Sequence, residues 1–314
     1  MTKTVAVLNA MARPLLEPRL PDWIEPRWFT SREELAEAAP AAEIGWFDTH
    51  HLGPIDEIVR SARHLKWLNT LGAGVELFPL DLLRERSVAF TNGAGLNAIT
   101  IAEYALLGML TIAKGYRDVV RAQDRHEWLH DAPGKGELYG SKALIVGAGG
   151  IGRRVAELLA PFGVAVTTMR RTPGPDDLGP DQWRARLGEF DWVIVAVAAT
   201  EETRGMIGAA EFAAMKPGAA ILNFARGFVI DTDALLETLR TGRLGAAFLD
   251  VTDPEPLPAD HPLWSFDQVH ISMHLSGRSQ ETLIVRAVDR FLANLDRYAK
   301  GEPLSHQVDL ALGY

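Results

Sequence analysis

A glycine-rich segment, Gly147-Ala148-Gly149-Gly150-Ile151-Gly152, has the spacing G-x-G-x-x-G and lies between an apolar run and a helix-forming run. The first glycine permits a tight turn, the second lets a pyrophosphate approach the backbone, and the third lets helix and strand pack closely. The N-terminus of the following helix offers N–H groups and the positive end of its dipole to phosphate. Although glycine-rich turns are common, this strand–turn–helix context predicts a dinucleotide site. The residues expected to bind the cofactor there are Gly147, Gly149, Gly150, Ile151 and Gly152.

Two arginines, Arg170 and Arg171, end the next apolar segment, where dinucleotide-binding sequences commonly place an acidic residue for the ribose 2′-OH. A guanidinium fork suits a 2′-phosphate instead. The sequence therefore predicts a preference for NADP(H), with NAD(H) possible. The alternative is that one or both arginines are solvated surface residues.

Three further side chains suggest acid–base chemistry on a small acid. Arg226 and His274 each follow an apolar strand, and Glu255 lies in a loop bracketed by prolines. A fixed guanidinium can hold an α-keto carboxylate and polarise the keto oxygen. A carboxylate next to an imidazole favours the imidazolium, which can protonate a forming alkoxide. The alternatives are a surface salt bridge for Arg226 and a structural or exposed His274.

Residues at the ends of other strands are further candidates for binding cofactor or substrate, and each has a structural alternative. The segment 71–76 (LGAGVE) contains two glycines whose neighbouring N–H groups can converge on an anion, or it is a plain turn. Asp250 ends the strand 246–249 and either contacts the cofactor or caps the following turn. Trp46 also ends a strand, and lining a pocket and packing in the core are equally open for it.

Strands and helices alternate along the chain, which favours parallel sheets and an α/β fold. Thr100 and Glu103 are spaced as a capping box for a helix that is apolar on nearly every face and ends at Lys114 and Gly115. Asp231 is expected to cap the helix 233–241. A long amphipathic helix is expected at 280–300. The expected strands are 5–8, 44–47, 65–70, 142–146, 164–169, 191–198, 219–223, 246–249 and 269–272.

With these motifs in place, the chain resembles the D-2-hydroxyacid dehydrogenase family, and within it the NADPH-dependent glyoxylate/hydroxypyruvate reductase-like members. Besides the glycine turn, four segments carry the resemblance in the family's order and spacing. They are Asp191–Gly208, Leu222–Gly227, Leu249–Val251 followed by Glu255–Pro258, and His270–Gly277. Two positions depart from the family pattern, because Met273 stands where Pro usually precedes the histidine and Ala198 stands where Pro is common.

The resemblance implies two Rossmann-like parallel-sheet domains. The dinucleotide-binding domain, 96–279, would be inserted into a discontinuous, flavodoxin-like substrate domain formed by 1–95 and 280–314, with the active site in the cleft between them. It implies that His274 and Glu255 form the proton donor and that Arg226 binds the substrate. Ala73 and Gly74 would bind its carboxylate. The further residues implied to line the cofactor are Thr203, Ala225, Asp250 and Gly277. The implied activity is reduction of a 2-keto acid to the D-2-hydroxy acid.

Composition bounds the other possibilities. The formal charge of −9 argues against nucleic-acid binding, and the chain has no cysteine for disulfides, thiolate nucleophiles or Cys-ligated metals. The segment 126–130 fits the zinc motif H-E-x-x-H, but the further ligands that such a site needs do not follow, so no metal is expected. No apolar run is long enough to span a bilayer, and no targeting segment begins the chain, so we expect a soluble cytoplasmic protein. A homodimer formed through the region 98–130 is expected from the family. The alternative function is a catalytically idle, NAD(P)-sensing interaction protein of the same fold.

Overall fold

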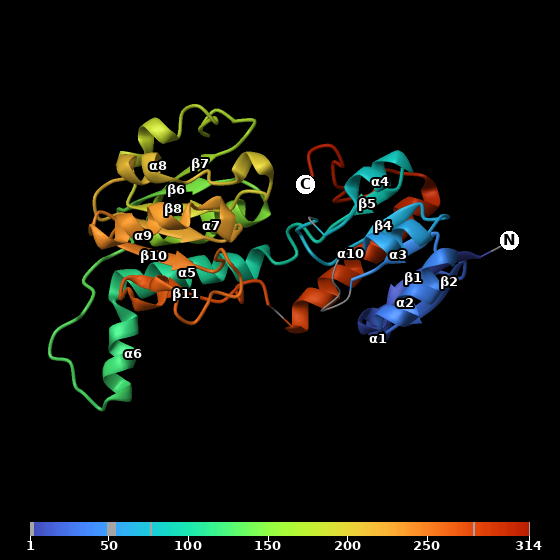
Figure 1. The fold of residues 1–314 in the computed structure, drawn as a ribbon, viewed down its shortest axis with the longest axis horizontal. Helices are drawn as coiled ribbons and strands as arrows, with labels where there is room; N and C mark the ends of the chain where they lie inside the picture. The colour runs from blue at the N-terminus through green and yellow to red at the C-terminus, as the bar shows by residue number, and fades with distance from the viewer. Residues whose placement is uncertain (1–2, 49–54, 76, 279, 314) are drawn as a thin grey trace. The chain divides into compact units, whose positions relative to one another are not determined.

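The chain divides into two compact units, one of which is inserted into the sequence of the other. The computed structural model describes residues 3–48, 55–75, 77–278 and 280–313 (Figure 1). Unit 1 comprises Met1–Asn97 and Ser279–Tyr314, and unit 2 comprises Ala98–Arg278. These boundaries lie within a few residues of the expected 95/96 and 279/280.

Unit 1 is built on a five-stranded parallel sheet in the order β2-β1-β3-β4-β5. Its strands are β1 (Thr4–Asn9), β2 (Ile24–Phe29), β3 (Ile44–Trp46), β4 (Trp67–Asn69) and β5 (Ala89–Thr91). The sequence predicted β1, β3 and β4 but not the two edge strands. β2 contains Pro26 and Arg27 and is only partly buried, and β5 has three residues, so neither gives a clear apolar pattern. Proline is tolerated at a sheet edge, where a backbone N–H is dispensable.

Helices cover both faces of this sheet. Val7 points into a core shared with α2 (Arg32–Ala38), α3 (Asp56–Ser61) and α4 (Leu80–Glu85). Its neighbours Ala6 and Leu8 point to the opposite face, which packs against α1 (Arg13–Leu16) and the long C-terminal helix α10 (Gln280–Lys300). The bounds of α10 are those predicted from its apolar spacing.

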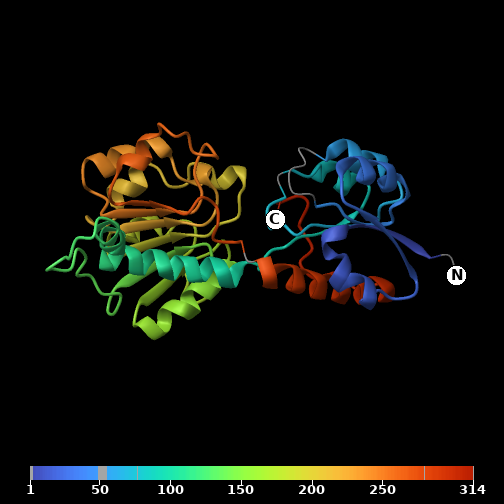
Figure 2. The same cartoon turned by 90° about the horizontal axis from the view of Figure 1, so that it is seen from below.

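Unit 2 is built on a six-stranded parallel sheet in the order β11-β10-β9-β8-β6-β7. Residues of β8, β9 and β10 are buried throughout, as expected for strands covered on both faces. One face packs against α5 (Ala98–Lys114) and α7 (Gly150–Leu159), and the other against α8 (Ala209–Ala214) and α9 (Thr232–Arg240) (Figure 2). The strands are β6 (Lys142–Val146), β7 (Ala165–Met169), β8 (Trp192–Val195), β9 (Ala220–Asn223), β10 (Ala246–Leu249) and β11 (Val269–Ile271). Two parallel-sheet units confirm the predicted α/β class.

The start of α5 differs from the prediction. The helix begins at Ala98, so Thr100 lies inside its first turn and does not cap it. The predicted end at Lys114 is confirmed, with Gly115 in the left-handed region at φ 57°. Burial is one-sided, because Ala105 and Met109 are buried whereas Leu107 is 51% exposed. The core of unit 2 needs only one face of this apolar helix, and the sequence pattern alone did not distinguish the faces.

The helix α6 (Tyr116–Asp124) follows at an angle of 73° to α5 and points away from the body of unit 2 (Figure 1). Within the described part of the chain, no single helix is long and apolar enough to cross a membrane, and only the bent α5–α6 pair meets the length and composition criteria. Residues 126–130, which match the zinc motif, lie after α6 in non-helical backbone, with His126 at φ 58°. The two histidines of that motif therefore do not share a helix face.

Candidate active site

The residues of unit 2 that could bind a cofactor or take part in a reaction lie along one edge of its sheet. The strands are all parallel, so the loops that follow them meet at the same edge, where open α/β sheets bind ligands. The glycine turn follows β6, Arg226 follows β9, Asp250 follows β10 and His274 follows β11. The topology therefore brings together groups that are more than 100 residues apart in sequence.

The glycine turn has the geometry expected of a pyrophosphate site. Gly147 has φ +106°, and a Cβ there would lie 2.5 Å from the carbonyl oxygen of Ala196. A Cβ on Gly152 would lie 2.0 Å from the carbonyl oxygen of Gly147, whereas one on Gly149 would meet nothing within 4 Å. The side of the turn at Gly149 is therefore open. No side chain caps α7, and Ile151 packs against the core, so this open end fits a dinucleotide phosphate.

The two arginines after β7 both carry carboxylate partners. Arg170 Nε lies 2.9 Å from Asp177 Oδ2, and Arg171 forms an ion pair with Glu202 from the loop after β8. Asp177 is mostly shielded, with 15% of its side chain exposed, whereas Glu202 is 74% exposed. β7 and β8 flank β6 in the sheet, so the Arg171–Glu202 pair joins the two loops on either side of the glycine turn.

The Asp177 side chain is held in place by hydrogen bonds. The Thr168 hydroxyl and the Gly174 backbone N–H donate to its carboxylate, and Arg170 adds a positive charge. These donors lower the pKa of Asp177, the Thr168 bond being the largest cause. Because the pKa is lowered, Asp177 stays ionised at neutral pH, and its contribution to stability is lost only as the pH falls through that lowered value.

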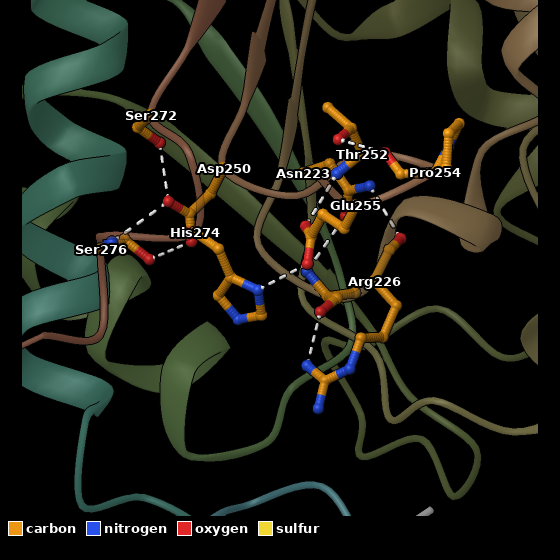
Figure 3. Close-up of polar contacts among 10 residues, drawn as sticks. Asn223, Arg226, Asp250, Thr252, Pro254, Glu255, Ser272, His274 and Ser276 are labelled. Atoms are coloured by element: carbon orange, nitrogen blue, oxygen red, sulfur yellow. Dashed lines mark hydrogen bonds and ion pairs between the residues drawn. The ribbon is translucent and has the colours of Figure 1, made fainter. Parts of the chain in front are cut away.

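His274 and Glu255 are brought together at the end of β11. His274 Nδ1 lies 3.0 Å from Glu255 Oε2, and the two side chains are 47% and 39% exposed (Figure 3). The backbone of His274 is left-handed, at φ 55°, and its N–H donates to the Asp250 carbonyl oxygen. The other carboxylate oxygen of Glu255 accepts the Thr252 backbone N–H at 3.1 Å. Both partners are therefore oriented by backbone contacts while their reactive groups remain accessible.

Asp250 fixes the turn that carries His274. Its side chain is buried and accepts the Ser272 hydroxyl at 2.7 Å, the Ser276 backbone N–H at 3.1 Å, and the Ser276 hydroxyl (Figure 3). These contacts match the second interpretation of Asp250, in which it holds the following turn. The contacts expected between Asp250 and the cofactor stay a prediction.

Arg226 extends from a turn that Asn223 organises. The buried Asn223 accepts the Ala225 N–H and donates to the Arg226 carbonyl oxygen, each at 3.0 Å. The Arg226 guanidinium donates to the Ala225 carbonyl oxygen at 2.9 Å. In Figure 3 the Arg226 guanidinium and the His274 ring extend toward the same side of the view. The structure therefore presents a cation and an acid–base pair from one edge of one sheet.

Other expected cofactor residues make local contacts in this structure. The Thr203 hydroxyl donates within its own loop and accepts the Thr200 N–H, which ties the turn after β8. Both backbone polar groups of Ala225 are engaged by the contacts just described, and Gly277 lies half-buried in the turn after Ser276. Their roles toward a cofactor stay predictions.

The expected carboxylate-binding residues Ala73 and Gly74 belong to unit 1. They follow β4 in a non-regular loop in which Ala73 is exposed, whereas Glu76 lies outside the described residues. Trp46 is buried, with its ring 5.1 Å from that of Phe291, so it packs in the core of unit 1.

The described parts of the chain contain no group of three or more His, Asp or Glu side chains placed to hold a metal ion. His270 stacks on Phe248, and burial together with the positive charge of Arg117 lowers its pKa. It therefore acts as a packed, neutral side chain and not as a partner of His274.

Several organising residues were not predicted from the sequence. Near Arg226 and His274 they are Asn223, Ser272 and Ser276. Near Arg170 and Arg171 they are Asp177 and Glu202. The two serines flank His274 at equal spacing, which is a visible signal. Asp177 and Glu202 give no such signal in the sequence, because they lie 9 residues from Thr168 and 31 residues from Arg171, the groups that they contact.

Comparisons with known proteins identify relatives of this chain. Residues 106–276 match the family described as D-isomer specific 2-hydroxyacid dehydrogenase, NAD binding domain. The chain is 32% identical over 275 residues to glyoxylate/hydroxypyruvate reductase A of Serratia proteamaculans, covering 83% of this chain and 85% of that protein. It is 30% identical over 260 residues to the human glyoxylate reductase/hydroxypyruvate reductase, covering 79% and 78%.

A solved structure extends the similarity over both units. The D-isomer specific 2-hydroxyacid dehydrogenase from Xanthobacter autotrophicus Py2, in complex with NADPH and MES, matches with a TM-score of 0.83 and 26% identity over 100% of both chains. The family model covers more than half of the chain, including the glycine turn, Arg226, Glu255 and His274. Together with the fold, this shows that the chain belongs to the D-isomer-specific 2-hydroxyacid dehydrogenase family of oxidoreductases.

Proposed function

We propose that the protein reduces a small 2-keto acid to the D-2-hydroxy acid with NADPH, in the manner of a glyoxylate or hydroxypyruvate reductase. The observation that carries the proposal is the 3.0 Å contact between His274 and Glu255, at the sheet edge that also presents Arg226 and the glycine turn. A protein that only binds a dinucleotide has no need of an oriented proton donor.

The proton transfer follows from the geometry of the pair. A reduced nicotinamide, when bound, supplies the hydride for the keto carbon. Nδ1 of His274 faces Glu255, so Nε2 is the ring atom left to give a proton to the keto oxygen. The Glu255 carboxylate holds the ring in this orientation through Nδ1. Hydride and proton together convert the C=O group into CH–OH, and His274 then regains a proton from solvent.

Arg226 would bind the substrate carboxylate and polarise the keto oxygen. Its turn is held by the buried Asn223, so the guanidinium starts from a fixed backbone. Charge-assisted bonds of this kind orient a carboxylate and stabilise negative charge that develops on the neighbouring oxygen. Ala73 and Gly74 would add backbone N–H donors to the same carboxylate.

The proposed preference for NADPH rests on Arg170 and Arg171, which follow β7 where the adenosine ribose is bound in this fold. The NADPH in the solved Xanthobacter relative is consistent with it. Asp177 and Glu202 already pair with these arginines, so a 2′-phosphate would have to share or replace a carboxylate partner. The predicted preference is therefore moderate rather than absolute.

A panel assay tests the function. Purified protein is mixed with glyoxylate, hydroxypyruvate, pyruvate and larger 2-keto acids, with NADPH or NADH, and absorbance is followed at 340 nm. We expect oxidation of NADPH with at least one acid, faster than oxidation of NADH, and a D-configured product. If no acid in the panel causes oxidation of NADPH or NADH although NADPH still binds, the proposal is contradicted and a catalytically idle NAD(P)-sensing protein is favoured.

We also propose that the protein forms a homodimer through α6 and the segment after it. Large apolar side chains are exposed there, with Trp128 86% exposed, Tyr139 80% and Tyr116 56%. A second copy that covers them would remove this apolar surface from water. Light scattering after size exclusion should give twice the mass of the chain, and Trp128→Asp should shift it toward the monomer. A monomeric wild-type protein would contradict the proposal.

The absence of cysteine fits a reducing compartment, so we propose the cytoplasm as the location, which cell fractionation tests.

A further inference from the structure

The loop 71–75 of unit 1 is anchored by a carboxylate that the mechanism above does not use. Asp48 follows β3 and is half-buried. Its carboxylate accepts the Thr70 hydroxyl at 2.6 Å, the Trp46 indole N–H at 2.6 Å, and the Leu71 backbone N–H. A carboxylate accepts about four hydrogen bonds. These three donors therefore occupy most of the hydrogen-bonding capacity of the carboxylate. Two of them, Thr70 and Leu71, lie at the base of the loop, so the carboxylate holds the loop there.

The contacts connect the loop to the core. Trp46 packs on Phe291, so its indole holds Asp48 from the interior. The Thr70 hydroxyl, which donates to Asp48, also accepts the Gly72 backbone N–H at 3.1 Å. Asp48 therefore orders the first two residues of the loop, Leu71 directly and Gly72 through Thr70.

The far side of the loop is fixed separately. The Asn92 amide donates to the Ala73 carbonyl oxygen and the Gly93 N–H donates to the Gly72 carbonyl oxygen, each at 2.8 Å. A Cβ at Gly93 would lie 1.8 Å from the Leu71 carbonyl oxygen, so glycine is required for this close approach. The loop is thus held from two sides along residues 71–73.

What remains is a pair of successive donors. Among the described residues, the backbone N–H groups of Ala73 and Gly74 donate to no protein acceptor, whereas those of Leu71 and Gly72 are both engaged. Successive N–H groups left open in a turn form a binding site for an anion. The anchored half of the loop thus sets the direction of the open half.

We infer that Asp48 is a positioning residue for substrate binding, which holds the loop so that the Ala73 and Gly74 N–H groups face the substrate carboxylate. The inference rests on the proposed function, because it needs an acid as substrate. Asp48 carries a negative charge itself, so its effect on an anionic substrate is indirect and acts through the groups that it holds, the Thr70, Trp46 and Leu71 donors among them. An Asn side chain keeps the shape of Asp48, and its amide oxygen can still accept the Trp46 and Leu71 N–H groups. Its NH2 group then faces the Thr70 hydroxyl, which can no longer donate to it, and the charge that strengthens all three hydrogen bonds is lost.

The test compares Asp48→Asn and Thr70→Val with the control Asp81→Asn, a unit 1 aspartate whose side chain is 91% exposed. Each full-length protein is assayed with the best 2-keto acid of the panel and with its methyl ester, which lacks the carboxylate charge. For Asp48→Asn we expect the KM of the acid to rise about tenfold, with kcat within about threefold of wild type, the ester KM nearly unchanged and the NADPH Kd unchanged. Thr70→Val should raise the acid KM by about three- to fivefold, and Asp81→Asn should leave it at the wild-type value.

The outcomes separate the two proposals. An inert wild-type protein overturns the proposed function and, with it, this inference. An active wild type combined with a wild-type acid KM in Asp48→Asn overturns the inference alone. Equal loss with acid and ester also overturns it, because that is the result of general damage to the unit. If Asp48→Asn fails to fold, Thr70→Val decides, and an unchanged acid KM in that variant overturns the inference.

Discussion

The two halves of the carboxyl edge of unit 2 hold their charged side chains in different ways. In the half formed by β9, β10 and β11, buried Asn223 and Asp250 fix the backbone, and the side chains of Arg226 and His274 project from it. In the half formed by β6 and β7, Arg170 and Arg171 are themselves bound by carboxylates from later loops. In the first half the carboxylate partner, Glu255, is itself part of the proposed proton donor, whereas in the second half a 2′-phosphate would have to share or replace the carboxylate partners of the arginines.

This difference separates catalysis from cofactor choice. Variants in the first half should change the rate with either cofactor, and variants in the second half should change the ratio between cofactors.

The largest effect is expected for His274→Asn. Asn tolerates the left-handed backbone of residue 274, at φ 55°, so the fold is kept while the proton donor is lost. We expect kcat to fall by roughly 10²–10⁴-fold with both NADPH and NADH, and the NADPH Kd to stay unchanged. The matched control is His306→Asn, an exposed histidine with the similar φ of 57°, which should keep the wild-type rate. Near-normal turnover by His274→Asn would remove the assigned role.

The next effect belongs to the arginine half. Arg170→Asp places a second carboxylate beside Asp177 and removes the guanidinium expected to bind the 2′-phosphate. A charged hydrogen bond of this kind contributes about 1.5–3 kcal/mol, which corresponds to about 10–100-fold in the ratio of kcat/KM for NADPH to that for NADH. Arg186→Asp, on an exposed arginine outside this edge, is the control. A wild-type ratio in Arg170→Asp would show that the 2′-phosphate is not bound there, and a loss shared equally by both cofactors would erase the separation of the two halves.

A smaller effect on rate, with a clear effect on stability, is expected for Asp250→Asn. The amide oxygen can keep the Ser272 hydroxyl and the Ser276 N–H, but the Ser276 hydroxyl must turn to accept from the amide NH2, and the charge that strengthens these buried hydrogen bonds is lost. We expect the free energy of unfolding to fall by about 1–3 kcal/mol and kcat/KM to fall by about tenfold with both cofactors, because the turn that carries His274 loosens. Chemical denaturation and steady-state kinetics measure these changes. Ser272→Ala, which removes only one hydroxyl donor, should cost less on both scales, and a variant as stable and active as wild type would show that this turn is held by other contacts.

The sequence predicted more of the first half than of the second. The order of strands and motifs locates Arg226, Glu255 and His274 because each follows a strand, and parallel strands bring their ends to one edge whatever the loops do. The partners Asp177 and Glu202 depend on the paths of two loops, which periodicity and turn signals do not determine. The edge strands β2 and β5 and the start of α5 were missed for a related reason. Short, partly polar or uniformly apolar segments carry no periodicity, and the surrounding packing decides their limits.

The smallest effect, and the sharpest test of the comparison, is expected for Glu202→Gln. An exposed ion pair contributes about 0.2–1 kcal/mol, so Glu202 competes only weakly with a phosphate for Arg171. Its neutral variant should therefore bind NADPH about 1.4- to 5-fold more tightly, with little change for NADH, in a fluorescence titration at low salt. Glu201→Gln is the matched control, because Glu201 is a neighbouring exposed acid that pairs with Arg204 instead. Equal gains for both cofactors, or equal gains in both variants, would mean that only the general negative charge of this loop matters. A gain confined to NADPH and to Glu202→Gln would identify Glu202 as the internal anion that the 2′-phosphate replaces.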